Sequence, residues 1–207
     1  MVQKHPVKRP RGRPRSYDSD KALAQARDAF WDSGYAGTSL DDLGNAMDMN
    51  RPSLYGAFGD KRALYLQTLD RYREMGRTAM KEELSYELPL ADALRRMFAR
   101  AISIYVAGKR SARGCFLIGT AATESVRDAK IRAAFAAGLH ELDELLAARL
   151  RHAIDQGELK ADIEPAILAR VLGGIMNSLA VRARAGESRA TLEATAEAGV
   201  RLVCGAD

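Results

Sequence analysis

The 207-residue sequence contains only two cysteines and three histidines. Cys115 and Cys204 lie far apart and match no metal-ligand spacing, so we expect neither a disulfide framework nor a metal site. The histidines leave few candidates for acid–base catalysis, and "HELDE" at 140–144 lacks the second histidine of a metalloprotease motif. No glycine-rich phosphate loop or nucleophile elbow occurs. We therefore expect a protein that is not an enzyme and has no cofactor.

Long hydrophobic runs are also missing. No segment approaches the roughly 18 apolar residues that a membrane span needs, and the basic N-terminus lacks the apolar stretch of a secretory signal. This pattern predicts a cytoplasmic protein that does not contact a membrane.

Acidic residues are absent from residues 1–16, which hold six of the basic ones. The formal net charge is +5, and without these six residues the chain has 26 basic and 27 acidic residues. A polyanion is therefore more readily bound by this end than by the rest of the chain. The segment also contains three prolines and a glycine, so we expect an extended, disordered arm. A solvated tail without a binding role is the alternative.

An alternating strand pattern is absent, and the sequence predicts an all-α fold. Asp18 is a good N-cap for a first helix, which Gly34 ends. The later segments predict helices over residues 39–46, 52–59, 60–80, 127–156, 162–185 and 189–204, with another beginning after Pro89 and a short apolar one in "CFLIGTAATES". Residues 107–114 are expected to form a loop.

Two short helices near the N-terminus are separated by a tight turn, "DMN". This arrangement fits a helix-turn-helix, in which the last helix lies in the major groove of DNA. The second short helix, which begins at Pro52 in "NRPSLYGAFGDKRAL", is too short and too polar to be core scaffold. Apolar residues at helical spacing predict the small core that holds the two helices together: Leu40, Leu43, Met47, Leu54 and Phe58.

The string "GYAGTSLDDLGNAMDMNRPSLYGAFGDKRAL", from Gly34 to Leu64, resembles the DNA-binding region of the TetR family of transcriptional regulators. About 45 residues at the N-terminus of the chain, including this string, carry the specific match. The resemblance implies an arm at 1–17, a helix-turn-helix domain at 18–62 and a helical ligand-binding and dimerisation domain at 63–207. It further implies a homodimer that binds a palindromic operator in double-stranded DNA as a repressor and responds to a small-molecule inducer.

Several residues of this motif are candidates for contact with DNA. Arg51 has a donor fork suited to guanine and stands with Pro52 at the start of the recognition helix, while Ser53 can reach a base or a phosphate. The resemblance implies backbone contacts for Tyr55 and Lys61. Thr38 and Ser39 can present a hydroxyl or a helix N-terminal amide to a phosphate, or can simply cap a helix.

The motif departs from the family pattern at three positions. Asp48 stands in the turn where relatives often have glycine, and we expect aspartate to tolerate the left-handed backbone there. Gly56 and Ala57 replace larger side chains that touch DNA in many relatives, so base readout from this helix is limited.

Residues 17–62 hold eight acidic and five basic residues, a net charge of −3. Such a module needs cationic help to approach DNA. The arm's "RGRPR" looks like an AT-hook core that fits a narrow A·T minor groove through Arg11, Arg13 and Arg15. Deletion of residues 1–16 is expected to weaken DNA binding and to flatten its dependence on salt.

The larger domain contains residues able to line a mainly apolar ligand pocket, with ordinary core packing as the usual alternative for each. The apolar and aromatic candidates are Tyr72, Met75, Met97, Phe98, Tyr105, Phe116, Phe135 and Met176. The polar ones are Thr120, Glu124 and Asn177. The segment "RGCFLIGTAATES" resembles one found in a branch of the family, and this resemblance implies that Cys115 is a candidate redox or electrophile sensor. The nearby Lys109, Arg110 and Arg113 can lower its pKa, and a buried structural cysteine is the alternative.

A dimer interface is predicted on the last two helices. Their apolar residues fall on one face, and small residues permit close helix approach. The predicted interface residues are Leu168, Leu172, Ile175, Leu179, Leu192, Ala196, Gly199 and Val203. A buried core within one chain is the alternative. A DNA-binding protein without an inducer is the remaining alternative for function.

Overall fold

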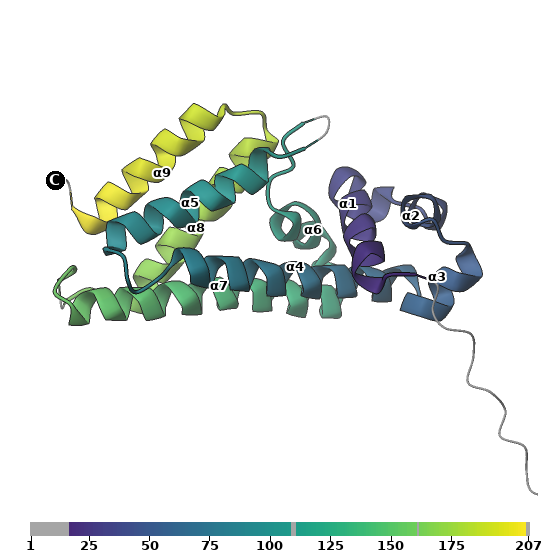
Figure 1. Cartoon of the computed structure of the whole chain (residues 1–207), viewed down its shortest axis with the longest axis horizontal. Helices are drawn as coiled ribbons and strands as arrows, with labels where there is room; N and C mark the ends of the chain where they lie inside the picture. The colour runs from purple at the N-terminus through teal and green to yellow at the C-terminus, as the bar shows by residue number, and fades with distance from the viewer. Residues whose placement is uncertain (1–16, 109–110, 161, 206–207) are drawn as a thin grey trace, which may run out of the picture.

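The computed structural model describes residues 17–108, 111–160 and 162–205. Within these residues every regular element is a helix, which confirms the all-α prediction. Figure 1 shows three helices at one end of the molecule and a larger bundle at the other, with α4 (Lys61–Glu83) reaching from the first to the second.

The three N-terminal helices are α1 (Ser19–Gly37), α2 (Leu40–Met47) and α3 (Arg51–Phe58). The Asp18 side chain caps α1, as predicted. Gly34 has φ 75° and breaks the helical path, after which a last turn continues to Gly37. This positive φ explains why the regular part of the helix ends where glycine stands.

The turn between α2 and α3 is tight. Asp48 adopts the left-handed conformation at φ 52°, ψ 46°, which confirms that aspartate is tolerated in the turn. The Met49 amide donates to the Gly44 carbonyl at 2.9 Å. A Cβ at Gly44 would lie 2.8 Å from the Met49 oxygen, so this close approach requires glycine. The turn thereby fixes the angle between the two helices of the motif.

The remaining helices follow the predicted boundaries within a few residues. The exception is the segment predicted as one short helix, in which a π-helical turn runs directly into a short α-helix. The elements are α5 (Leu90–Val106), η1 (Leu117–Ala121), α6 (Ala122–Glu124), α7 (Ala129–Asp155), α8 (Pro165–Arg184) and α9 (Arg189–Cys204).

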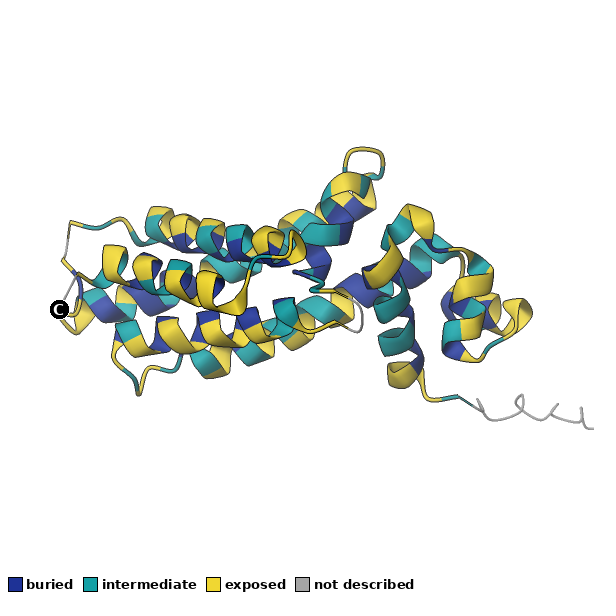
Figure 2. Ribbon diagram, turned by 90° about the horizontal axis from the view of Figure 1, so that it is seen from above, coloured by how far each residue is buried: buried dark blue, intermediate teal, exposed yellow. Residues whose placement is uncertain are grey.

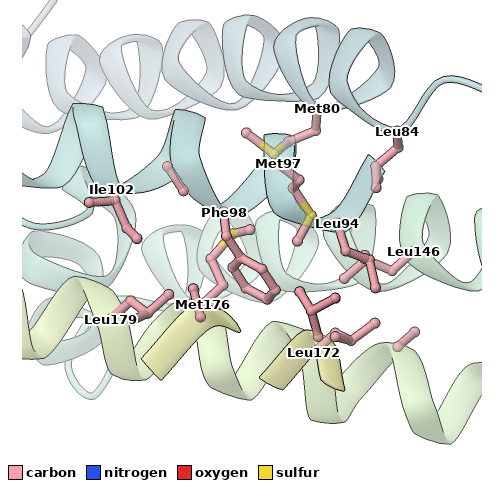
Figure 3. Close-up of a cluster of buried hydrophobic side chains, with 14 of the residues drawn as sticks. Met80, Leu84, Leu94, Met97, Phe98, Ile102, Leu146, Leu172, Met176 and Leu179 are labelled. Atoms are coloured by element: carbon pink, nitrogen blue, oxygen red, sulfur yellow. The ribbon is translucent and has the colours of Figure 1, made fainter. Parts of the chain in front are cut away.

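Buried apolar side chains form two clusters. Figure 2 shows buried residues in both the N-terminal unit and the larger bundle. The larger lies among α5, α7, α8 and α9, where Phe98 packs near Leu94, Met176 and Leu179 (Figure 3). The smaller joins α1 to α3 with the start of α4, η1 and α7. The N-terminal core therefore continues into the larger bundle.

The residues predicted to hold α2 and α3 together are core residues. Leu43, Met47, Leu54 and Phe58 are buried, and Leu40 packs against the same cluster partly buried. In α8, by contrast, apolar residues occur all round the helix. By length and composition alone, α8 is apolar enough to span a membrane, whereas the sequence analysis expected no such segment. Leu172 and Leu179 of this helix are fully buried in the larger core. It serves as a core helix.

Candidate nucleic-acid interface and internal cavity

Helix α3 points one face into solvent and the other into the N-terminal core. Leu54 and Phe58 are buried, whereas Arg51, Pro52, Ser53 and Tyr55 are exposed. The Asn50 side chain caps the helix by accepting from the Ser53 amide at 2.9 Å. All four predicted contact residues of this helix thus share an accessible surface, and their contact with DNA remains a prediction.

Arg51 is exposed but paired. Its Nε and Nη2 donate to the two carboxylate oxygens of Asp41 at 2.9 and 2.7 Å. The hydrogen bond from Arg51 lowers the pKa of Asp41, so this carboxylate is ionised at neutral pH. Binding to guanine requires Arg51 to exchange this partner for a base. Sequence reasoning missed the pair because ten residues separate its members.

Thr38 and Ser39 behave as structural residues rather than as free phosphate ligands. Thr38 is buried, and its hydroxyl donates to the Gly34 carbonyl at 2.7 Å, so the predicted hydroxyl contact to a phosphate is wrong. Ser39 is exposed and forms a full capping box with Asp42, which accepts from the Ser39 amide at 2.8 Å and from its hydroxyl at 2.6 Å. A phosphate at this helix start would have to compete with the Asp42 carboxylate.

Lys61 begins α4 beside the recognition motif. Its ammonium lies 4.5 Å from the centre of the Tyr35 ring, and burial lowers its pKa. The ring holds the side chain near the surface of the N-terminal unit. The arm residues Arg11, Arg13 and Arg15 lie outside the described residues.

A cavity of about 390 Å³ lies between the C-terminal part of α4 and helices α5, α7 and α8. Its wall is mainly apolar, and Trp31 of α1 closes one side. The structure brings six residues of the predicted sets to this wall: Tyr72, Met75, Tyr105, Cys115, Met176 and Asn177. A cavity of this size holds a small organic molecule.

The other predicted pocket residues do not line the cavity. Met97, Phe98 and Phe116 are fully packed core side chains, the first two in the cluster of Figure 3. Thr120 is buried and shares a 2.6 Å hydrogen bond with Tyr65. Periodicity reports which residues face inward, and it cannot separate packed positions from those that border a void.

Two further predicted pocket residues lie toward the N-terminal unit instead of the cavity. Phe135 packs against the smaller core. Glu124 lies near Lys61 and Tyr35, where its charge adds to the effect of burial that raises the pKa of Tyr35 and partly offsets the burial that lowers the pKa of Lys61. Phe135 was not separable from cavity residues by its spacing, because α7, on which it stands, also lines the cavity.

The cavity also contains residues that the sequence analysis missed. Among them are four arginines, one glutamate and two glycines: Arg27, Arg73, Arg77, Arg100, Glu141, Gly76 and Gly138. The arginines stand on three different helices, so no local pattern marks them as neighbours.

The interpretation of Cys115 as a low-pKa thiol is wrong. The thiol stands in the cavity wall, where burial raises its pKa, and the Tyr72 hydroxyl lies 3.6 Å from its sulfur. Arg113 pairs with Asp28 and Asp32 instead of supporting a thiolate. Lys109 and Arg110 lie outside the described residues. A thiol in such surroundings stays protonated and reacts slowly.

The predicted dimer face is largely used within one chain. Leu172, Leu179, Leu192 and Ala196 are buried in the larger core, so they are not available to a second copy. Leu168, Ile175 and Val203 pack partly buried against the same core. Gly199 allows α9 to approach α8, since a Cβ there would lie 2.8 Å from Ile175. The alternative of a core within one chain is correct for the four buried residues, whereas an interface role for Leu168, Ile175 and Val203 stays a prediction.

Two contacts join the cavity region to the recognition motif. Arg62, one residue after Lys61, forms a bidentate ion pair with Asp128, which also caps α7. Tyr65 is fully buried and bonds to Thr120 of η1. Leu117 and Ile118, at the start of η1, line the cavity. η1 therefore touches both regions.

The short, exposed α3, set on its own core by a tight turn, defines a helix-turn-helix protein of the transcription-regulator class. A model of bacterial regulatory proteins of the tetR family matches residues 22–68. A model of the tetracyclin repressor-like C-terminal domain matches residues 91–198.

Relatives of similar length support the same classification. The HTH-type transcriptional repressor ComR of Escherichia coli (strain K12) is 33% identical over 95% of this chain and 93% of its own length. The HTH-type transcriptional regulator YezE of Bacillus subtilis (strain 168) is 32% identical over 78% and 83% of the two chains. The chain therefore belongs to the TetR family of DNA-binding transcriptional regulators.

Solved structures show the same architecture. A cysteine mutant of the TetR family regulator CifR, complexed with 26-bp double-strand operator DNA, has a TM-score of 0.78 and 31% identity, covering 91% of this chain and 98% of its own. Reduced NemR of E. coli has a TM-score of 0.80, covering 91% and 97%, and at 22% identity it supports the fold alone.

Proposed function

We propose that this chain is a homodimeric repressor that binds a palindromic operator and releases it when a small molecule occupies the cavity. The observation that carries the DNA-binding part is the exposed face of α3, where Arg51, Ser53 and Tyr55 stand together above a packed core. ComR is named as a repressor, and CifR was solved with operator DNA. Both names support the same role for this chain.

In the proposed complex Arg51 reads guanine in the major groove after it leaves Asp41. Ser53, Tyr55 and Lys61 contact the sugar-phosphate backbone and fix the position of the helix on the duplex. The basic arm supplies further electrostatic attraction, because the motif itself has a negative net charge.

An exposed apolar stripe supports dimerisation through α8 and α9. Ile167, Val171 and Val181 of α8 are each more than half exposed, at helical spacing, and Leu202 of α9 is 85% exposed. These residues lie away from the core-facing positions of the same helices. In a twofold dimer they would be covered, and the two α3 helices would reach successive major grooves.

The dimer is tested by sedimentation. Val171→Glu is expected to shift the protein toward monomer, because a charge in an apolar interface opposes association. Val126→Glu is the matched control, since Val126 is 77% exposed and stands outside α8 and α9. A wild-type chain that sediments as a monomer at all concentrations contradicts the dimer.

Ligand response is proposed to travel through η1 and the start of α4. A ligand that displaces Leu117 or Ile118 would shift η1, and the Arg62–Asp128 ion pair would transmit that shift to the base of α3. Asp128→Asn keeps a side-chain cap on α7 but breaks the charge pair. The variant is expected to bind operator and to release it less completely on ligand addition.

Operator binding itself is tested by selecting duplexes from a genomic library and measuring affinity by fluorescence anisotropy. Arg51→Ala is expected to weaken binding by about tenfold or more. Arg96→Ala is the matched control, because Arg96 is also exposed and ion-paired, to Glu83 at the other end of the molecule. Equal losses in both variants would contradict the proposal.

This function places the protein in the cytoplasm, where it meets the bacterial chromosome, and requires no catalysis.

A thermal-shift experiment distinguishes this function from that of a DNA-binding protein without an inducer. The proposal expects at least one compound of a metabolite panel to raise the melting temperature and to oppose operator binding.

A further inference from the structure

The charged residues of the cavity wall are strongly biased toward one sign. Arg27, Arg73, Arg77 and Arg100 line it, with Glu141 as the single acidic residue among the lining groups. An apolar cavity surrounded in this way has a positive potential, which attracts anions and disfavours organic cations.

Two of these arginines are neutralised by neighbours. Arg27 pairs with Asp28 at 2.9 Å, and Arg73 pairs with Glu141 and with Asp70. Arg77 and Arg100 are exposed and pair with no carboxylate anywhere in the described ranges, although most other arginines there do. They stand on α4 and α5, the two helices on either side of the cavity. Two free guanidinium groups therefore remain available to an anion.

The interior of the cavity also contains polar groups without protein partners. Tyr105 is only 5% exposed and lines the cavity, yet its hydroxyl makes no hydrogen bond to any group in the part of the chain that the structure describes. Asn177, also in the wall, likewise has no hydrogen-bond partner among the described residues. Asn177 is half-buried and the buried Tyr105 side chain borders the cavity, so both can bond to polar atoms of a molecule held there.

We infer that the effector is an amphipathic organic anion. Its apolar body occupies the wall formed by Trp31, Ile104, Leu142 and Met176, and its carboxylate or sulfonate pairs with Arg77 and Arg100 at the mouth. Tyr105 and Asn177 bond to polar atoms within the body of the ligand. The inference rests on the proposed function, since it names the ligand class of the same cavity.

The test uses two fluorescent probes with one aromatic skeleton. 8-Anilinonaphthalene-1-sulfonate has an anionic group, and N-phenyl-1-naphthylamine is the same molecule without it. Both are titrated into the full-length protein at fixed ionic strength, without DNA. The quantity compared is the ratio of the two dissociation constants, which cancels the contribution of the shared apolar body.

The double variant Arg77→Gln/Arg100→Gln is expected to weaken binding of the sulfonate about tenfold to a hundredfold and to leave binding of the neutral probe unchanged. Its control is Arg127→Gln/Arg151→Gln, which removes two other exposed, unpaired arginines outside the cavity wall. The inference is overturned if the double variant keeps the wild-type ratio, or if the control changes it equally.

Gly76→Leu shows where the probes bind. Gly76 lines the cavity, and a Cβ there meets no atom within 4 Å, so the backbone position leaves room for a side chain to begin at the wall. The variant is expected to lose both probes, and full retention of the sulfonate would place it elsewhere and overturn the inference. Because these titrations contain no DNA, they fail or succeed independently of operator binding.

Discussion

The two halves of α4 meet very different surroundings. In the N-terminal half, Tyr65 is fully buried among Phe30, Tyr35 and Phe116, with ring centres 4.8 to 6.0 Å away. In the C-terminal half, Gly76 and Arg77 border a cavity of about 390 Å³. One helix thus joins a packed aromatic core to an open, cationic site.

This difference assigns separate tasks to the two halves. Packed interiors resist deformation and move as units, so the N-terminal half can pass a displacement on to α3. A cavity with unpaired polar groups gains stability only when a ligand fills it. The comparison predicts that substitutions in the packed half lower stability, whereas substitutions in the cavity half change ligand affinity.

Phe116 provides the largest test of this division. Phe116→Ala is expected to lower the free energy of unfolding by about 3–5 kcal/mol, because it removes a fully buried ring that touches Trp31, Tyr65 and Tyr72. Met75→Ala, at a half-exposed position of the cavity wall, is expected to change it by less than about 0.5 kcal/mol. Urea unfolding measures both, and similar losses would erase the distinction.

A smaller effect is expected from the buried hydrogen bond between Tyr65 and Thr120. Thr120→Val keeps the shape but leaves the Tyr65 hydroxyl without this partner, at a cost of about 1–3 kcal/mol. Thr78→Val is the control in the cavity half, where the exposed hydroxyl bonds only to the Glu74 carbonyl. The packed-half assignment fails if Thr78→Val is the more destabilising of the two.

The smallest effect is a pH dependence of the folding stability, caused by surface ion pairs that lie outside α4. Arg95 and Arg201 lower the pKa of Glu197 from 4.5 to about 2. Because the folded pKa is depressed, this stabilisation is complete above pH 4.5 and is lost as the pH falls toward 2. Glu197→Gln is expected to make the stability curve slightly flatter in that window, and an unchanged slope would show that the pair contributes nothing.

Local chemistry explains what the sequence could predict. Helix ends are set by neighbouring residues, so Asp18 and Ser39 marked two helix starts correctly. The inward and outward faces of α3 followed from spacing alone. The Arg51–Asp41 pair and the arginines of the cavity were not predictable, because each depends on how separate helices pack.

Part of the predicted dimer face proved to be core for a related reason. Helix α8 has apolar residues on opposite sides, with fully buried Leu172 next to half-exposed Val171. Spacing identifies two apolar faces but cannot say which one meets the core of the same chain. Only the packed structure separates them.

Base-specific readout by Arg51 is the central claim, and one measurement tests it most directly. Wild-type protein and Arg51→Ala are titrated with the selected operator and with duplexes in which single G·C pairs are replaced by A·T. The account predicts that the wild type discriminates against replacement of one G·C pair in each half-site and that Arg51→Ala loses this discrimination. If Arg51→Ala discriminates at every position as the wild type does, Arg51 does not read the operator.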